Sequence, residues 1–216
     1  MPTEKITGDY FIKVLIGELT FALIALISAS AWSQPLQTSP QGASTGVTFT
    51  LDPSGSRLRW TLGSTLHTVH GTFALKRGEV SFDPSSGNAS GEIVADAASG
   101  ESGNESRDKK MHREILESGR YSDIVFRPSR VEGKVSAGGT SSVQLHGVFV
   151  LHGAQHEMSV PIQTELSGNH WKGSAKFSIP YIQWGLKSPN TFLLKADPAV
   201  EIELEMSGTL QGTIPP

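Results

Sequence analysis

Alternation of apolar and polar side chains constrains the fold of this chain more than any other feature. In the stretch "VEIELEMSG", residues 200–208, Val200, Ile202 and Leu204 alternate with glutamates. Successive side chains of a β-strand point to opposite faces, so a period of two predicts a strand with one covered and one hydrated face. The same period predicts strands over residues 57–62, 69–75, 80–83, 91–96, 123–130, 142–152, 157–166 and 170–179.

Stretches rich in Gly, Ser, Asn and Asp, such as "DPSSGN" and "SAGGTS", separate these segments and are typical of turns. Helical patterns are missing between them except at one place, which excludes a repeating βαβ plan. Roughly eight strands, each with one apolar face, can hide those faces without open edges by closing into a barrel. The sequence therefore predicts an all-β, antiparallel, eight-stranded barrel. Pro161 cannot donate to a ladder, so a bulge or an edge position is expected there.

The segment "SRDKKMHREILESGRYSDIVF", residues 106–126, breaks the alternation. Asn104 or Ser106 can cap the start of a helix over residues 107–118, and Gly119 suits the position just after its end. One weakly amphipathic helix cannot form a core layer, so we expect it to cover a barrel end or lie against the wall. Its apolar stripe consists of Met111, Ile115 and Leu116, and its cations, expected in water, are Arg107, Lys109, Lys110 and Arg113.

The front of the chain has the features of a secretory signal. Lys5 and Lys13 precede the apolar run Leu19–Ala29, which ends in a small-x-small pattern. We predict that residues 1–31 are a signal peptide. The alternative is an uncleaved membrane anchor, but the run of 11 residues is shorter than the ~20 that span a bilayer.

Composition narrows the function classes further. Residues 32–46 are rich in Ser, Gln, Pro, Thr and Gly and are predicted to be a disordered lead-in to one domain over residues 47–212. Residues 32–216 carry 16 basic and 18 acidic side chains, which gives no electrostatic footprint for nucleic acid and no polybasic membrane patch. The chain has no cysteine, so it has neither disulfides nor a cysteine for a lipid anchor. We expect a soluble periplasmic or secreted protein.

Several short motifs occur in order along residues 47–210. One is the interrupting segment, with Arg107-Asp108, Met111-His112, Ile115-Leu116-Glu117, Tyr121 and Ile124-Val125-Phe126. The others are Gly71-Thr72-Phe73, Phe82-Asp83-Pro84, His146-Gly147, His152-Gly153, and the closing Val200, Ile202, Leu204 and Gly208. Together they resemble the YceI-like, polyisoprenoid-binding, lipocalin-like proteins. Ser122 where many members have Pro, and "REILESGR" where many have a Phe-Phe pair, indicate a subfamily.

The resemblance implies a lipocalin-like barrel with a helix between the middle strands. It also implies an apolar lumen that takes a prenyl chain or similar lipid, export, and in many members a homodimer. The residues predicted to line the lumen are Leu58, Trp60, Phe73, Phe82, Ile93, Ile124, Phe126, Leu145, Phe149, Val160, Ile162, Phe177, Ile202 and Leu204. The alternative is that they fill a closed core. Lys109, Lys110 and Arg113 could meet a polar head group, or could be a solvated helix face.

Other chemistry finds little support in the sequence. The seven histidines, His67, His70, His112, His146, His152, His156 and His170, form no metal-ligand pattern, although His152 and His156 flank a turn and could approach. The Gly-x-Ser-x-Gly run at residues 42–46 lies in the lead-in, with no predicted strand before it and no predicted helix after it, so it is not expected to form a nucleophile elbow. The chain also has no cysteine nucleophile, and we predict no catalytic residue, no metal and no cofactor. Two alternatives stay open: a filled barrel acting through its surface as a stress or assembly factor, and a hydrolase or isomerase built on the lumen.

The stretch "PYIQWGLKSPNTFLL", residues 180–194, is the second part that does not alternate. Tyr181, Trp184, Phe192 and Leu193 could cap the other barrel end, face a partner, or form a small satellite core under a long loop.

Overall fold

A computed structural model describes residues 46–214 and contains ten strands, one short α-helix and two further helical turns. All strand pairs are antiparallel. The strands are β1 (Val47–Leu51), β2 (Arg57–Leu62), β3 (Val69–Phe73), β4 (Leu75–Phe82), β5 (Ala89–Asp96), β6 (Asp123–Glu132), β7 (Gly139–Leu151), β8 (Ala154–Ser167), β9 (His170–Ile179) and β10 (Val200–Gln211).

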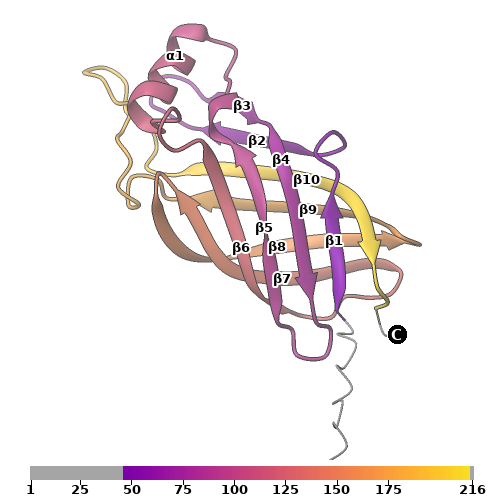
Figure 1. Cartoon of the computed structure of the whole chain (residues 1–216). Helices are drawn as coiled ribbons and strands as arrows, with labels where there is room; N and C mark the ends of the chain where they lie inside the picture. The colour runs from indigo at the N-terminus through magenta and orange to yellow at the C-terminus, as the bar shows by residue number, and fades with distance from the viewer. Residues whose placement is uncertain (1–45, 215–216) are drawn as a thin grey trace, which may run out of the picture. The chain divides into compact units, whose positions relative to one another are not determined.

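Eight of these strands close into a ring in the order β1-β4-β5-β6-β7-β8-β9-β10, and β10 pairs back with β1 (Figure 1). The predicted eight-stranded barrel is therefore confirmed. Strand β2 takes the place of β1 along β10, since Leu51 pairs with Gly208 and Arg57 pairs with Glu205. Strand β3 pairs with β2, so these two strands extend the barrel wall past the end of β1.

The alternation placed side chains on the correct faces of the strands. In β10, Ile202 and Met206 are buried while Glu201, Glu203 and Glu205 are exposed. The predicted strands did not include a separate range for β1. A turn at residues 52–56 separates β1 from β2, and both strands pair with the same edge of β10.

Strands β8 and β9 pair along only part of their length. They pair from Ile162 with Ala175 down to Ser167 with His170 and no further. Pro161 lies directly beyond this point, in regular register with Gln144 of β7. The expectation of an edge position is correct, and a bulge is absent from the β7–β8 pairing at this proline.

The interrupting segment is helical, as predicted, but it changes type midway. Helix α1 (Glu105–Lys110) continues as a π-helical turn, Met111–Ile115. Asn104 caps its start by accepting a hydrogen bond from the backbone N–H of Arg107 at 3.0 Å, which confirms one of the two predicted caps. The predicted end at Gly119 is wrong, because Glu117, with φ of +45°, takes the left-handed position that terminates the helix.

Two apolar clusters divide the barrel interior along its axis. One cluster, around Val47, Phe82 and Trp171, fills the end where β1 begins. The other, around Trp60, Tyr181 and Ile202, lies at the end that carries α1 (Figure 1). We call these the closed end and the helix end. The predicted signal peptide and nearly all of the predicted lead-in lie outside the described residues. No helix within residues 46–214 is both long enough and apolar enough to cross a membrane.

Candidate functional site

An apolar cavity of about 350 Å³ occupies the helix end of the barrel. Side chains from β2 to β10, from the helical segment and from two loops line it. Every predicted lumen residue except Phe82 is part of this lining. Phe82 instead contributes to a smaller space of about 80 Å³ at the closed end, where side chains fill most of the interior. The predicted lumen is therefore open in one half of the barrel.

The helical segment covers the cavity with its apolar stripe. Met111, Ile115 and Leu116 are half-buried and line the cavity, and they pack against the cluster at the helix end. Arg113 of the same segment does not line the cavity and is three-quarters exposed. The segment is therefore a cover for the cavity, which is one of the two positions expected for it.

Hydrogen bonds fix this cover to the loop that precedes it. Arg107 donates to both the hydroxyl and the carbonyl of Ser102, at 2.7 and 2.9 Å, and the Ser102 hydroxyl bonds to Asp108. Arg107 is thus anchored and half-buried, whereas the sequence predicted it to be largely solvated. His112 bridges the carbonyl of Gly100 at 2.8 Å and the hydroxyl of Ser118 at 3.1 Å.

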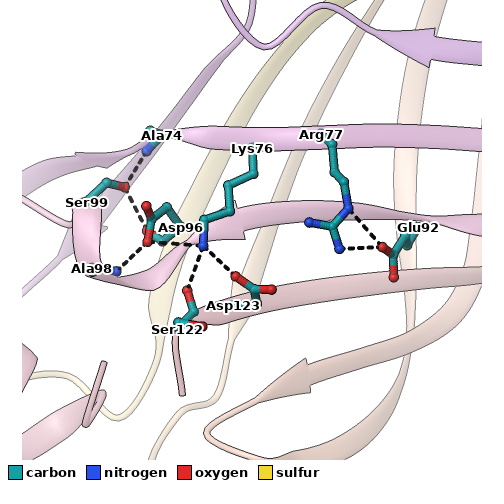
Figure 2. Close-up of polar contacts among 9 residues, drawn as sticks. All are labelled: Ala74, Lys76, Arg77, Glu92, Asp96, Ala98, Ser99, Ser122 and Asp123. Atoms are coloured by element: carbon teal, nitrogen blue, oxygen red, sulfur yellow. Dashed lines mark hydrogen bonds and ion pairs between the residues drawn. The ribbon is translucent and has the colours of Figure 1, made fainter. Parts of the chain in front are cut away.

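An ion-pair cluster on the outside of the barrel joins the two ends of the inserted segment, residues 97–122, which connects β5 to β6 (Figure 2). Asp96 ends β5, Asp123 begins β6, and the two are paired in register. The ammonium of Lys76 lies 2.6 Å from Asp123 and 3.6 Å from Asp96. The hydrogen bond to Asp123 raises the pKa of Lys76, so the cation is held between the two carboxylates.

Two loops complete the rim on the helix end. Residues 63–68 join β2 to β3, and residues 180–199 join β9 to β10. They are bonded together, since the N–H of Thr65 donates to the carbonyl of Lys195 at 2.9 Å. From these loops Ser64, His67, Tyr181, Leu186, Pro189, Leu194 and Ala196 line the cavity. The Tyr181 hydroxyl donates to the carbonyl of Asp197 at 2.9 Å, and burial raises the pKa of Tyr181.

Trp184 of the longer loop packs against the part of β8 that no longer pairs with β9. Its ring stacks on that of His156, with 4.1 Å between the ring centroids and an interplanar angle of 3°. The centroid of the Phe149 ring lies 5.6 Å from that of Trp184. His152 and His156 flank the β7–β8 turn and could have approached each other, but they take different partners. His152 packs on Tyr121 at 4.4 Å and lies 3.4 Å from Glu117. Within residues 46–214, no three His, Asp or Glu side chains gather as a metal site would require.

The three cations proposed for a head group occupy different places. Lys110 lines the cavity, as does Arg107. Lys109 instead pairs with Glu105, and Arg113 pairs with Glu114, both on the exposed face of the segment. The hydrogen bond from Arg113 lowers the pKa of Glu114, and the charges of Lys110 and Lys187 add to the effect.

The YceI-like domain model matches residues 49–207, most of the chain and nearly all of the barrel. The chain belongs to the YceI-like family. The match begins inside β1 and ends inside β10, so it includes the inserted cover and both rim loops.

Solved structures show the same fold as this YceI-like chain at low identity. BcnA of Burkholderia cenocepacia is 16% identical with a TM-score of 0.60, over 74% of this chain and 99% of its own. A polyisoprenoid binding domain from Saccharophagus degradans, implicated in plant cell wall breakdown, is 15% identical with a TM-score of 0.58, over 74% and 98%. The YCEI protein of Campylobacter jejuni is 16% identical with a TM-score of 0.51, over 67% and 86%. No curated protein sequence matches the chain.

The YceI-like motif residues have identifiable tasks in this structure. Arg107, Asp108 and His112 anchor the cover, while Met111, Ile115 and Leu116 line the cavity. Gly71 leaves room for the indole ring of Trp60 and for the carbonyl of Glu101, both of which a Cβ atom would meet.

Sequence reasoning missed two groups of cavity residues. The alternation had already placed Leu151, Ala175, Ile179, Val200 and Met206 on apolar strand faces without assigning them to the site, and all of them line the cavity. The loop residues had no period that could reveal them, because their contribution depends on how the two loops fold over the rim.

Proposed function

We propose that this YceI-like chain binds a polyisoprenoid or similar long-chain lipid in the cavity and carries it without chemical change. The cavity is the observation that carries the proposal: about 350 Å³ of apolar space at the helix end, against about 80 Å³ at the closed end. Ligand pockets commonly occupy ~300–1,000 Å³. The polyisoprenoid binding domain from Saccharophagus degradans shares the fold, which supports this choice of ligand class.

The lining suits an aliphatic chain because it offers few competing polar groups. Burying one CH₂ group contributes about 0.8 kcal/mol, so a five-carbon prenyl unit contributes roughly 3 kcal/mol before costs. Lost translational and conformational freedom offsets several kcal/mol of this gain. A ligand with several prenyl units therefore binds better than a short one, up to the length that the cavity holds.

The rim offers a place for a polar end group. Arg107 and Lys110 are the cations that line the cavity, and His67 lies on the facing loop. A lipid can place its apolar tail among the strands and its anionic or hydrogen-bonding head group against the cations of this rim.

We further propose that residues 1–31 direct export and that the protein acts in the periplasm or outside the cell. The homodimer stays a prediction.

A lysine on the cavity wall tests the assignment of this site. Phe149→Lys places a charge among apolar side chains, and we expect uptake of farnesol, a three-unit prenol, to fall at least tenfold. Gln144→Lys, on the exposed face of the same strand, is the matched control and should bind as the parent does. Binding is measured by equilibrium dialysis at fixed salt, and circular dichroism verifies folding.

Two results would oppose the proposal. Unchanged uptake by Phe149→Lys would place the ligand elsewhere, and absence of uptake by the parent would favour a barrel that acts through its surface.

A second experiment distinguishes a carrier from an enzyme: prenol bound to the parent protein is extracted and analysed by mass spectrometry. Intact prenol fits a carrier, whereas a converted product would indicate an enzyme built on the lumen.

A further inference from the structure

Two adjacent apolar side chains at the tip of the 180–199 loop are almost fully exposed. Phe192 is 98% exposed and Leu193 is 75% exposed. Leu66, at the tip of the neighbouring 63–68 loop, is 64% exposed. Isolated exposed apolar residues are common, but several on joined loop tips are typical of a surface that contacts something apolar. We call these three residues the apolar tips.

The apolar tips stand at the rim of the cavity. Leu194, next to Leu193, lines the cavity, and so does His67, next to Leu66. The two loops are joined by the bridge between Ser64 and Ala196. Figure 1 shows the 180–199 loop projecting beyond the strands at the end that also carries α1. A lipid that enters or leaves through this rim passes beside the tips.

The charge around the tips differs from that of the remaining barrel. Residues 63–68, 105–116 and 180–199 together carry six basic and four acidic side chains. The rest of residues 46–214 carries ten basic and fourteen acidic side chains. Lys187 and Lys195 lie on the same loop as Phe192 and Leu193, and neither is within ion-pair distance of a described carboxylate. The near-neutral charge of the whole chain hides this local difference.

We propose that the helix end docks on an anionic lipid bilayer, with the apolar tips inserted among the head groups and the surrounding lysines against the lipid phosphates. Aromatic and aliphatic side chains at loop tips partition into the bilayer interface, and lysines add attraction to anionic lipids. Docking in this orientation points the cavity rim at the membrane, so the lipid moves between bilayer and barrel without crossing water. The inference rests on the proposed lipid-carrier function and names the surface from which the ligand is taken.

The absence of cysteine from the chain allows the contact to be located directly. Leu193→Cys and, at the closed end, Ala137→Cys each provide one site for an environment-sensitive fluorophore in the full-length protein. Both positions are exposed. Both labelled proteins carry the same N-terminal segment, so its own membrane affinity cancels in the comparison.

We expect the Leu193→Cys probe to shift to the blue with vesicles of phosphatidylcholine and phosphatidylglycerol at 3:1. The shift should weaken at least threefold with phosphatidylcholine alone or in 0.5 M NaCl, and the Ala137→Cys probe should stay unchanged. No shift at Leu193→Cys, or equal shifts at both positions, would overturn the proposal. A shift that grows with protein concentration without vesicles would also overturn it, in favour of contact between two copies.

A pair of variants separates docking from ligand binding. Phe192→Ser/Leu193→Ser should lower vesicle affinity about tenfold and leave farnesol uptake from solution unchanged, because neither residue lines the cavity. Phe149→Lys should show the opposite pattern. If the parent takes up farnesol but the serine variant docks as the parent does, the docking surface is wrong while the carrier function stands.

Discussion

At the scale of single residues, three glycines of the family motifs are explained by close approach of other atoms. A Cβ atom at Gly71 would meet the Trp60 ring, and one at Gly147 would meet the carbonyl of Arg127. At Gly208 it would meet the carbonyl of Thr50 on the strand that closes the barrel. Backbone atoms, among them the carbonyl oxygen of Glu101 that a Cβ atom at Gly71 would also meet, cannot rotate away as a flexible side chain can. Each of these three glycines therefore marks a point where the wall has no space for a side chain.

Gly71→Ala is therefore expected to lower the free energy of unfolding by about 1–3 kcal/mol, the usual cost of overpacking. Gly138→Ala is the control, since nothing lies within 4 Å of a Cβ atom at that exposed position. Its effect should stay within ~0.5 kcal/mol. Urea unfolding of both variants beside the parent measures the difference. Equal stabilities for the two variants would show that β3 can shift away from Trp60 without cost.

At the scale of elements, the sequence predicted the strands well, but it did not predict the position of their residues along the barrel axis. Alternation identifies which side chains face inward, and Phe149 and Phe82 both do. It does not say at which end of the barrel an inward residue lies, which is why Phe82 was placed with the ligand but packs at the closed end. The π-helical turn and the left-handed Glu117 were not predicted, because both depend on tertiary contacts around His112 and His152.

The helical cover depends on its attachment to the barrel, where Lys76 holds Asp96 and Asp123 together. Removing the cation leaves two like charges paired in register, which is unfavourable. We expect Lys76→Ala to speed backbone hydrogen exchange in residues 97–122 severalfold. Exchange in β7 and β8 should stay unchanged.

Arg77→Ala is the matched control for that experiment. Arg77 is the next residue on the same strand, and it pairs with Glu92 away from the ends of the inserted segment (Figure 2). If both variants exchange alike over residues 97–122, the Lys76 cluster does not hold the cover in place.

At the scale of the whole molecule, several exposed carboxylates favour the folded state at neutral pH. Hydrogen bonds from Ser54 and Ser85 lower the pKa of Asp52 and Asp83 below the ordinary value of 3.8. A hydrogen bond from Lys176 lowers the pKa of Glu203 below 4.5. A carboxyl group whose pKa is lower in the folded state stabilises that state above its unfolded pKa and loses this effect as the pH falls.

The free energy of unfolding should therefore decrease as the pH is lowered from about 4.5 through the lowered pKa values of these groups. Urea unfolding at a series of pH values from 6 to 2.5 measures this slope. Asp83→Asn removes one contributing group and should make the slope shallower. A slope equal to that of the parent would mean that the hydrogen bonds of Asp83 contribute nothing to the acid dependence.

The open half of the barrel is the property on which the account of function depends, and intact mass spectrometry tests it most directly. The protein is isolated without detergent from cells that make it and is sprayed under non-denaturing conditions. We predict a complex of one chain with one long-chain, isoprenoid-like lipid, and loss of that added mass in Phe149→Lys but not in Gln144→Lys. A chain that carries no lipid, and that takes up none when offered prenols of increasing length, would contradict the account.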